Sequence, residues 1–243
     1  MNTLIVICGP TACGKTPTAI ALAKMINGEI VSADSKQIYR GMDIGTAKPA
    51  IAEREGIPHH LFDVAEPGED FSAKLFQQMA TKVIDDIFKR GKTPILAGGT
   101  GFYINAAIYE NALDRKEDEI LQARYKAQFF ILHRDRAKLY EAINQRVETM
   151  IKQGLAAEVE ILLNAGVKEN STAMQALGYK EMLPYLRGQC SLDETVKSIQ
   201  QGSRRYAKRQ LTWFRHQIKG HWLSMDEMTV NEAAEKIRNF LQI

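Results

Sequence analysis

The stretch that decides the fold is Gly9-Pro-Thr-Ala-Cys-Gly-Lys-Thr16. It fits the pattern G-x-x-x-x-G-K-[ST], in which glycines let backbone N–H groups converge on phosphate oxygens. An apolar run at residues 3–8 predicts a buried strand before it, and helical spacing at 15–25 predicts a helix after it. The N-terminus of that helix favours an anion, Lys15 adds a charge, and Thr16 offers a hydroxyl to Mg²⁺. The stretch therefore predicts a P-loop for a diphosphate or triphosphate, and the alternative is an ordinary glycine-rich turn.

Strands and helices alternate on both sides of this motif. Further strands are predicted at 29–32, 60–64, 93–97, 128–133 and 221–224. Helices are predicted at 71–89, 102–108, 134–153, 155–164, 174–186, 192–217 and 231–241, with Gly28 just past the end of the first helix. We therefore expect an α/β fold, a P-loop NTPase-like parallel sheet flanked by helices, with a helical C-terminal region.

The composition excludes several classes of protein. Of 243 residues, 45% are hydrophobic and 25% are charged, as in ordinary globular chains, and no apolar run approaches the roughly 20 residues of a membrane span. The three cysteines have no metal-ligand spacing, the five histidines suit structural roles, and the N-terminus has no signal-peptide pattern. We expect a cytoplasmic protein with no membrane contact.

Two further loops follow predicted strands. Asp34 comes after the second strand, and Gly98-Gly-Thr100-Gly101 comes after the fourth. Parallel strands place ligands beyond their carboxyl ends, so both loops should share one crevice with the P-loop. Asp34 could there act as a base or hold Mg²⁺, although a turn cap alone would also explain it, and the glycines could simply serve a tight turn.

One segment is strongly basic. Residues 197–220 contain seven Lys or Arg and no Asp or Glu, whereas the whole chain has a net charge of only +3. Cations interleaved with Tyr206, Trp213 and Phe214 suit RNA, and an arginine could also clamp a pyrophosphate. A solvated amphipathic helix is the alternative.

Seven blocks in this order closely resemble the bacterial tRNA dimethylallyltransferase (IPP transferase) family. They are residues 9–16 and 34–39, Gly-Met-Asp-Ile-Gly-Thr-Ala-Lys at 41–48, residues 56–60 and 98–103, Gln-Ala-Leu-Gly-Tyr-Lys-Glu at 175–181, and residues 205–214. The resemblance implies transfer of a dimethylallyl group from dimethylallyl diphosphate to N6 of adenosine 37, beside the anticodon of tRNA, with Mg²⁺. It also implies a P-loop that holds this diphosphate, and we expect a monomer.

The resemblance also implies roles for individual residues. Asp34 would accept a hydrogen bond or a proton from the adenine N6, Thr100 would hydrogen-bond the bridging or leaving oxygen, and Arg204 would neutralise the departing pyrophosphate. The diphosphate would lie on Gly9, Thr11, Ala12, Cys13, Gly14, Lys15 and Thr16, with Thr16 also placing Mg²⁺. The tRNA would contact Asp34, Ser35, Lys36, Gln37, Gln175, Ala176, Leu177, Gly178, Tyr179, Lys180, Arg205, Lys208 and Arg209, with Ser35 and Gln37 flanking the base.

The chain departs from the family in one place. The family has a helical insertion that contacts the anticodon stem-loop, and here it is missing or truncated. We therefore divide the chain into the first part of the core (1–113), the junction of the insertion (114–126), and the rest of the core with the tRNA-binding helices (127–243). Either the protein lacks the insertion or the sequence omits it, and we favour omission.

Two other functions stay open at this stage. A related enzyme prenylates free adenine nucleotides, although such an acceptor needs no extended basic face. A small-molecule kinase could use the same P-loop, and it would turn over ATP, which we expect this chain not to do. A non-catalytic RNA-binding protein would not need Lys15, Asp34 and Thr100 together.

Overall fold

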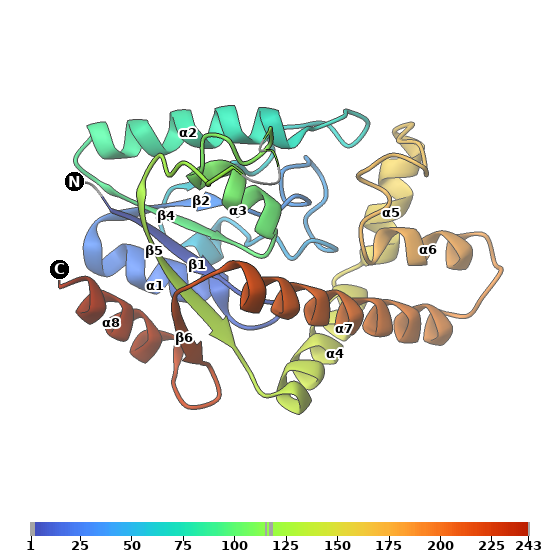
Figure 1. Cartoon of the computed structure of the whole chain (residues 1–243). Coiled ribbons are helices and arrows are strands. Elements are labelled where there is room, and N and C mark those ends of the chain that lie inside the picture. The colour runs from blue at the N-terminus through green and yellow to red at the C-terminus, as the bar shows by residue number, and fades with distance from the viewer. Residues whose placement is uncertain (1–2, 115, 117–118, 243) are drawn as a thin grey trace.

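A six-stranded parallel sheet forms the centre of the molecule (Figure 1). The computed structural model describes residues 3–114, 116 and 119–242. The strands lie in the order β3-β2-β4-β1-β5-β6. Their bounds are β1 Thr3–Cys8, β2 Gly28–Ser32, β3 His59–His60, β4 Thr93–Gly98, β5 Lys126–His133 and β6 His221–Ser224. The predicted parallel sheet is confirmed.

Helices cover both faces of this sheet. Alternate residues of β1 point to opposite faces, so Ile5 and Ile7 join one buried cluster while Leu4 and Val6 join the other. Helices α1 (Lys15–Ile26) and α8 (Val230–Leu241) pack on the first face. Helices α2 (Ala73–Lys89) and α3 (Gly101–Ile108) pack on the second, above the sheet in Figure 1. The core therefore has three layers.

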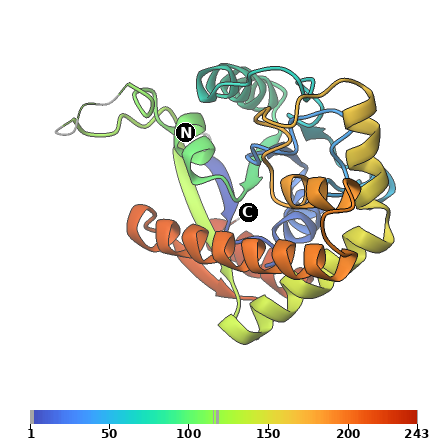
Figure 2. The same ribbon diagram turned by 90° about the vertical axis from the view of Figure 1, so that its right-hand side faces the viewer.

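A second group of helices lies beyond the carboxyl ends of the strands. It comprises α4 (Arg136–Lys152), α5 (Leu155–Asn164), α6 (Tyr179–Leu186) and α7 (Leu192–Gln217). Figure 2 shows these helices as an arc facing the sheet edge, with α7 running across the front. Because the P-loop opens toward this edge, the arc forms the far wall of any site there.

Three predicted boundaries are wrong for local reasons. The third strand ends at His60 because Leu61 and Asp63 adopt left-handed φ angles of 67° and 55°, which a strand cannot accommodate. Helix α6 begins at Tyr179 instead of Met174, after turns that end at Gly178 with φ 94°. Asn27, at φ 51°, ends α1 in the left-handed conformation predicted for Gly28, and Gly28 is the first residue of β2.

The connection from α3 to β5 closes into a narrow neck, defined by residues 108–111 and 120–124. Tyr109 and Ala123 form an antiparallel bridge. Glu110 N donates to Gln122 O over 2.9 Å, and Arg124 N donates to Ile108 O over 2.8 Å. The two ends of the connection therefore lie side by side where the insertion was expected.

Candidate functional site

The P-loop is held in shape by close backbone packing. Gly9 has φ 146°, and a Cβ there would lie 2.2 Å from the carbonyl oxygen of Leu132, so no other residue fits. Gly14, at φ 91°, precedes the first residue of α1. Lys15 Nζ donates to Pro10 O over 2.7 Å. The lysine is thus folded back over the loop that it would serve.

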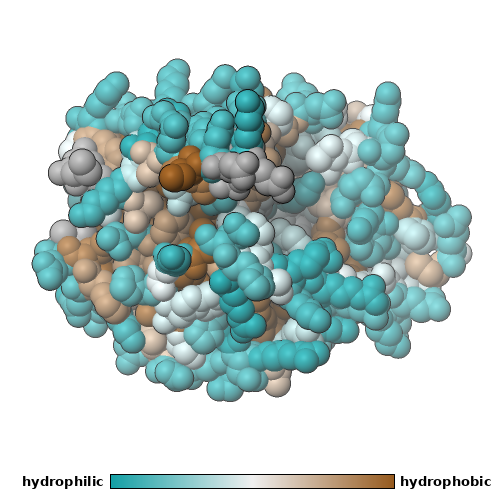
Figure 3. Space-filling model, in the orientation of Figure 1, coloured by the Kyte–Doolittle hydropathy of each residue, from teal (hydrophilic) through white to brown (hydrophobic). Residues whose placement is uncertain are grey.

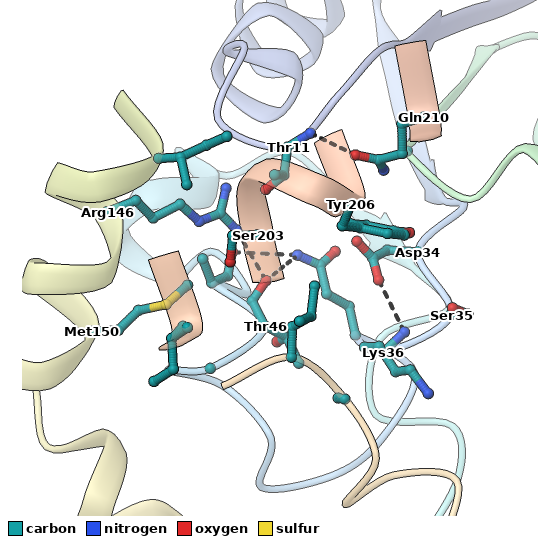
Figure 4. A pocket seen from close by; sticks show the side chains of 18 of the residues that line it. Thr11, Asp34, Ser35, Lys36, Thr46, Arg146, Met150, Ser203, Tyr206 and Gln210 are labelled. Carbon is teal, nitrogen blue, oxygen red and sulfur yellow. Dashed lines mark hydrogen bonds between the residues drawn. The ribbon is translucent and has the colours of Figure 1, made fainter. Parts of the chain in front are cut away.

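A cavity of about 380 Å³ separates the P-loop from the helical arc (Figure 4). Thr11, Lys15 and Thr16 line it from the P-loop side, whereas Cys13 is wholly buried and Gly9, Ala12 and Gly14 are not among the lining residues. Apolar side chains from the arc line the other side, including Ile143, Val147, Met150, Leu177 and Ile199. The cavity therefore combines a polar wall from the P-loop with an apolar wall from the helices.

Asp34 lines the same cavity at the end of β2. Its Oδ1 accepts a hydrogen bond from Lys36 N over 2.9 Å, which fixes the carboxylate in a turn. Burial lowers the pKa of Lys36, and the charge of Asp34 opposes that shift. The predicted convergence of the P-loop with this loop is observed, and Asp34 serves both as a turn cap and as a carboxylate that faces the cavity.

Thr100 is not among the residues that line the cavity, but it contacts one of them. Its hydroxyl accepts from Ser35 N over 3.2 Å and donates to Ser35 Oγ over 3.4 Å. The turn at residues 98–101 reaches the cavity through Gly98. Thr100 therefore positions Ser35, which does line the cavity.

The side chain of Gln37 forms hydrogen bonds within the protein. It is 8% exposed, its Nε2 donates to Thr46 O and Ala47 O at 3.2 and 3.3 Å, and its Oε1 accepts from Ser32 Oγ. It lines the cavity, but its Nε2 already donates to two backbone carbonyl groups of the protein. It holds the 46–47 loop in place.

Arg146 is a site residue that no motif predicted. It projects from α4 into the cavity, and Nη2 donates to Thr46 O over 3.3 Å (Figure 4). Burial lowers its pKa, while Asp34 opposes the shift. The sequence signal was a lone cation on the apolar stripe of Ile143, Val147 and Met150, because positions three and four apart share a helix face.

Arg204 lies away from the cavity lining. Its Nη1 donates to Asn144 Oδ1 over 2.7 Å, and its guanidinium stacks 5.9 Å above the ring centre of Tyr140. The structure therefore brings Arg146, and not Arg204, into the cavity.

Tyr206 of α7 forms part of the roof of the cavity, beside Asp34 (Figure 4). Burial, with the nearby Asp34 charge, raises its pKa to about 12, so the hydroxyl stays protonated at neutral pH. That hydroxyl is hydrogen-bonded to Thr100 and Gln210. A neutral aromatic ring thus covers the carboxylate.

Glu158 of α5 anchors the loop that carries Thr46. Its carboxylate accepts from the backbone N–H groups of Asp43, Ile44 and Gly45 at 2.8–3.0 Å, and from Tyr179 Oη at 2.6 Å. Gly45 is required because a Cβ would lie 2.4 Å from the Tyr179 ring. Tyr179 and Gly178, which were predicted to contact tRNA, are both buried, and Tyr179 is hydrogen-bonded to Glu158.

The remaining predicted RNA contacts fall on two surfaces. Lys36, Gln175, Ala176, Leu177, Lys180 and Arg209 line the cavity. Arg205 and Lys208 lie with Arg209 and Trp213 on the outer face of α7, where Figure 3 shows a band of hydrophilic side chains. Since these three cations are exposed and make no ion pair with a described residue, they are available to an anionic partner.

A P-loop that opens onto a cavity with an apolar wall, together with a carboxylate and a buried arginine, defines an α/β protein of the P-loop class. Within the described residues, no helix is both long and apolar enough to cross a bilayer. No group of three or more His, Cys, Asp or Glu could hold a metal in that same part of the chain.

The family model described as IPP transferase matches residues 37–128 and 110–217. Curated relatives include a tRNA dimethylallyltransferase of Macrococcus caseolyticus, 39% identical over 96% of this chain and 94% of its own, and one of Acetivibrio thermocellus, 41% identical over 97% and 96%. A tRNA delta(2)-isopentenylpyrophosphate transferase of Staphylococcus epidermidis has a similar crystal structure, with a TM-score of 0.90 and 36% identity over 100% of this chain and 99% of its own. The chain belongs to the IPP transferase family, as its motifs predicted.

The alignments also show a shortage in this chain. The alignment with the Macrococcus protein is 295 positions long. This chain contributes 96% of its 243 residues, about 233, so about 62 positions of the relative have no counterpart here. The two segments matched by the family model overlap at 110–128, which places the break at the neck. The insertion expected at this point therefore has no counterpart in the 243-residue sequence.

Proposed function

We propose that this protein transfers the dimethylallyl group of dimethylallyl diphosphate to N6 of adenosine 37 in tRNA. The observation that carries the proposal is a single cavity in which Lys15 and Thr16 of the P-loop face Asp34 and Arg146. In a member of a family whose relatives are named tRNA dimethylallyltransferases, this arrangement suits a diphosphate at one wall and an acceptor base beside the carboxylate.

The donor end of the cavity stabilises the leaving group. N6 attacks C1 of the dimethylallyl group, the C1–O bond breaks, and its electron pair leaves on the diphosphate. Lys15, the amide groups of the P-loop and Arg146 stabilise the charge that accumulates on those oxygens. The apolar wall of Ile143, Val147 and Met150 accommodates the five-carbon chain and excludes water.

The acceptor end activates a weak nucleophile. The exocyclic amine of adenine needs desolvation and positioning, and Asp34 accepts the proton that N6 loses. The base reaches the cavity only if it leaves the anticodon-loop stack. The exposed cations of α7 and the rim at Gln175 and Lys180 bind the surrounding RNA backbone.

The donor set suits Mg²⁺. Thr16 and Asp34 line one cavity, and Mg²⁺ binds with few carboxylates plus substrate phosphate oxygens and water. The Thr16 hydroxyl would hold the ion together with substrate oxygens, and the ion would neutralise part of the diphosphate charge while Asp34 stays free to take the N6 proton.

The experiment that tests this proposal is incubation with dimethylallyl diphosphate, Mg²⁺ and unmodified tRNA that carries A36-A37-A38. We expect N6-(dimethylallyl)adenosine at position 37 and one diphosphate released per transfer. We also expect the enzyme to be a monomer that works in the cytoplasm. Product on AMP but not on tRNA would favour the free-nucleotide enzyme. ATP-dependent phosphorylation without prenyl transfer would contradict the proposal.

A further inference from the structure

Gln210 of α7 joins two loops that come from neighbouring strands. Its Oε1 accepts a hydrogen bond from Thr11 N over 2.9 Å, in the P-loop after β1 (Figure 4). Its Nε2 donates to Gly99 O over 2.8 Å, in the turn after β4. The side chain is 8% exposed and lines the cavity between these loops. One amide therefore bridges the P-loop and the turn at residues 98–101.

The local geometry leaves room for this side chain alone. A Cβ at position 99 would lie 2.4 Å from Gln210 Nε2, so Gly99 is required for the close approach. Only a carboxamide of this length offers an acceptor to one loop and a donor to the other. The bridge also contacts the Tyr206 hydroxyl, and through it Thr100.

We propose that Gln210 is a positioning residue that fixes the P-loop against the 98–101 turn and thereby sets the affinity of the site for the diphosphate. Loss of the bridge would leave Thr11 N–H and Gly99 C=O without partners in a buried place, and both loops would shift to recover them. The proposal rests on the proposed function for the identity of the anion only.

The exposed face of α7 provides the contrast that a test needs. Arg205 and Lys208 lie on the same helix as Gln210, but both are exposed and neither lines the cavity. A change at Gln210 that acts through the P-loop lowers affinity for the diphosphate and spares affinity for RNA. A change that merely loosens α7 lowers thermal stability and does not single out the diphosphate.

The experiment measures inorganic pyrophosphate binding by titration calorimetry with Mg²⁺, and tRNA binding by filter retention, well below the melting temperature. In Gln210→Met, which keeps the length and removes both bonds, we expect pyrophosphate affinity to fall about tenfold or more and tRNA affinity to change less than twofold. Gln210→Glu keeps the bond to Thr11 N but sets a carboxylate against Gly99 O, so it should also lose affinity, and it replaces the first variant if that one does not fold. Gln201→Met, at an exposed position of α7, is the matched control.

Unchanged pyrophosphate affinity in a folded Gln210 variant would overturn the proposal, as would equal losses for pyrophosphate and tRNA. Wild-type protein that binds pyrophosphate but does not prenylate tRNA would refute the proposed function, and the same titrations would still decide the role of Gln210. Wild-type protein that does not bind pyrophosphate would overturn both.

Discussion

Replacement of Arg146 by Gln tests the assignment of the diphosphate-binding arginine. One of the five N–H donors of Arg146 bonds Thr46 O, which leaves four that can reach a ligand. A bidentate contact to a diphosphate makes two charge-assisted hydrogen bonds, each contributing about 1.5–3 kcal/mol. Lys15 shares the same charge, so we take the lower end of that sum, about 3–4 kcal/mol. This energy corresponds to a loss of roughly 10²- to 10³-fold in kcat/KM for the prenyl diphosphate.

Arg204→Gln is the matched control, because Arg204 bonds Asn144 outside the cavity lining. Steady-state rates at varied dimethylallyl diphosphate, with saturating tRNA, should show a change below about threefold for this variant. Filter binding should show that neither variant loses tRNA affinity by more than a few-fold. A larger loss in Arg204→Gln than in Arg146→Gln would refute the reasoning and return the role to Arg204.

Three further outcomes are expected. Asp34→Asn keeps the acceptor for Lys36 N, so single-turnover rates should fall by about 10²–10⁴ while tRNA binding persists; an unchanged rate would exclude Asp34 as the base. Glu158→Gln should lower the free energy of unfolding by roughly 2–3 kcal/mol, against about 1 kcal/mol for Tyr179→Phe, because Glu158 accepts three backbone N–H bonds as well as the bond from the Tyr179 hydroxyl; equal losses in thermal unfolding would contradict this. Hydrogen bonding to Arg90 holds the pKa of Glu29 well below its usual value, so this carboxylate stabilises the fold above about pH 4.5 and less at lower pH; Glu29→Gln should cost about 3 kcal/mol at pH 7 in thermal unfolding, and the difference from wild type should shrink below pH 4.

The architecture could be predicted because the hydrophobic periodicity and the helix-capping and turn residues agree along most of the chain. Helix α7 spans the predicted residues 192–217, where Ser191 caps the N-terminus by accepting from Glu194 N. The errors lie where a backbone conformation cannot be inferred from composition. Residues 61–65 are as apolar as a strand, yet two left-handed residues, Leu61 and Asp63, end the pairing.

The site was predicted as far as its motifs reached. Asp34 and the P-loop follow strands, so topology alone brings them together. Arg146 has no motif, and its place depends on how α4 packs against the sheet edge. Gln37 and Tyr179 belong to sequence blocks that resemble the family, but their side chains form internal hydrogen bonds. Only the packed structure shows those bonds.

The neck between α3 and β5 also bears on how chain length can vary in this family. Because the Tyr109–Ala123 bridge already holds both ends together, the core does not depend on what lies between them. The entropy of closing a loop rises only slowly with its length, so tens of residues can be gained or lost there at small cost in folding free energy. The neck is thus a site that tolerates insertion, at which an accessory module can be added to the core or removed. A reporter domain could be inserted at the same place.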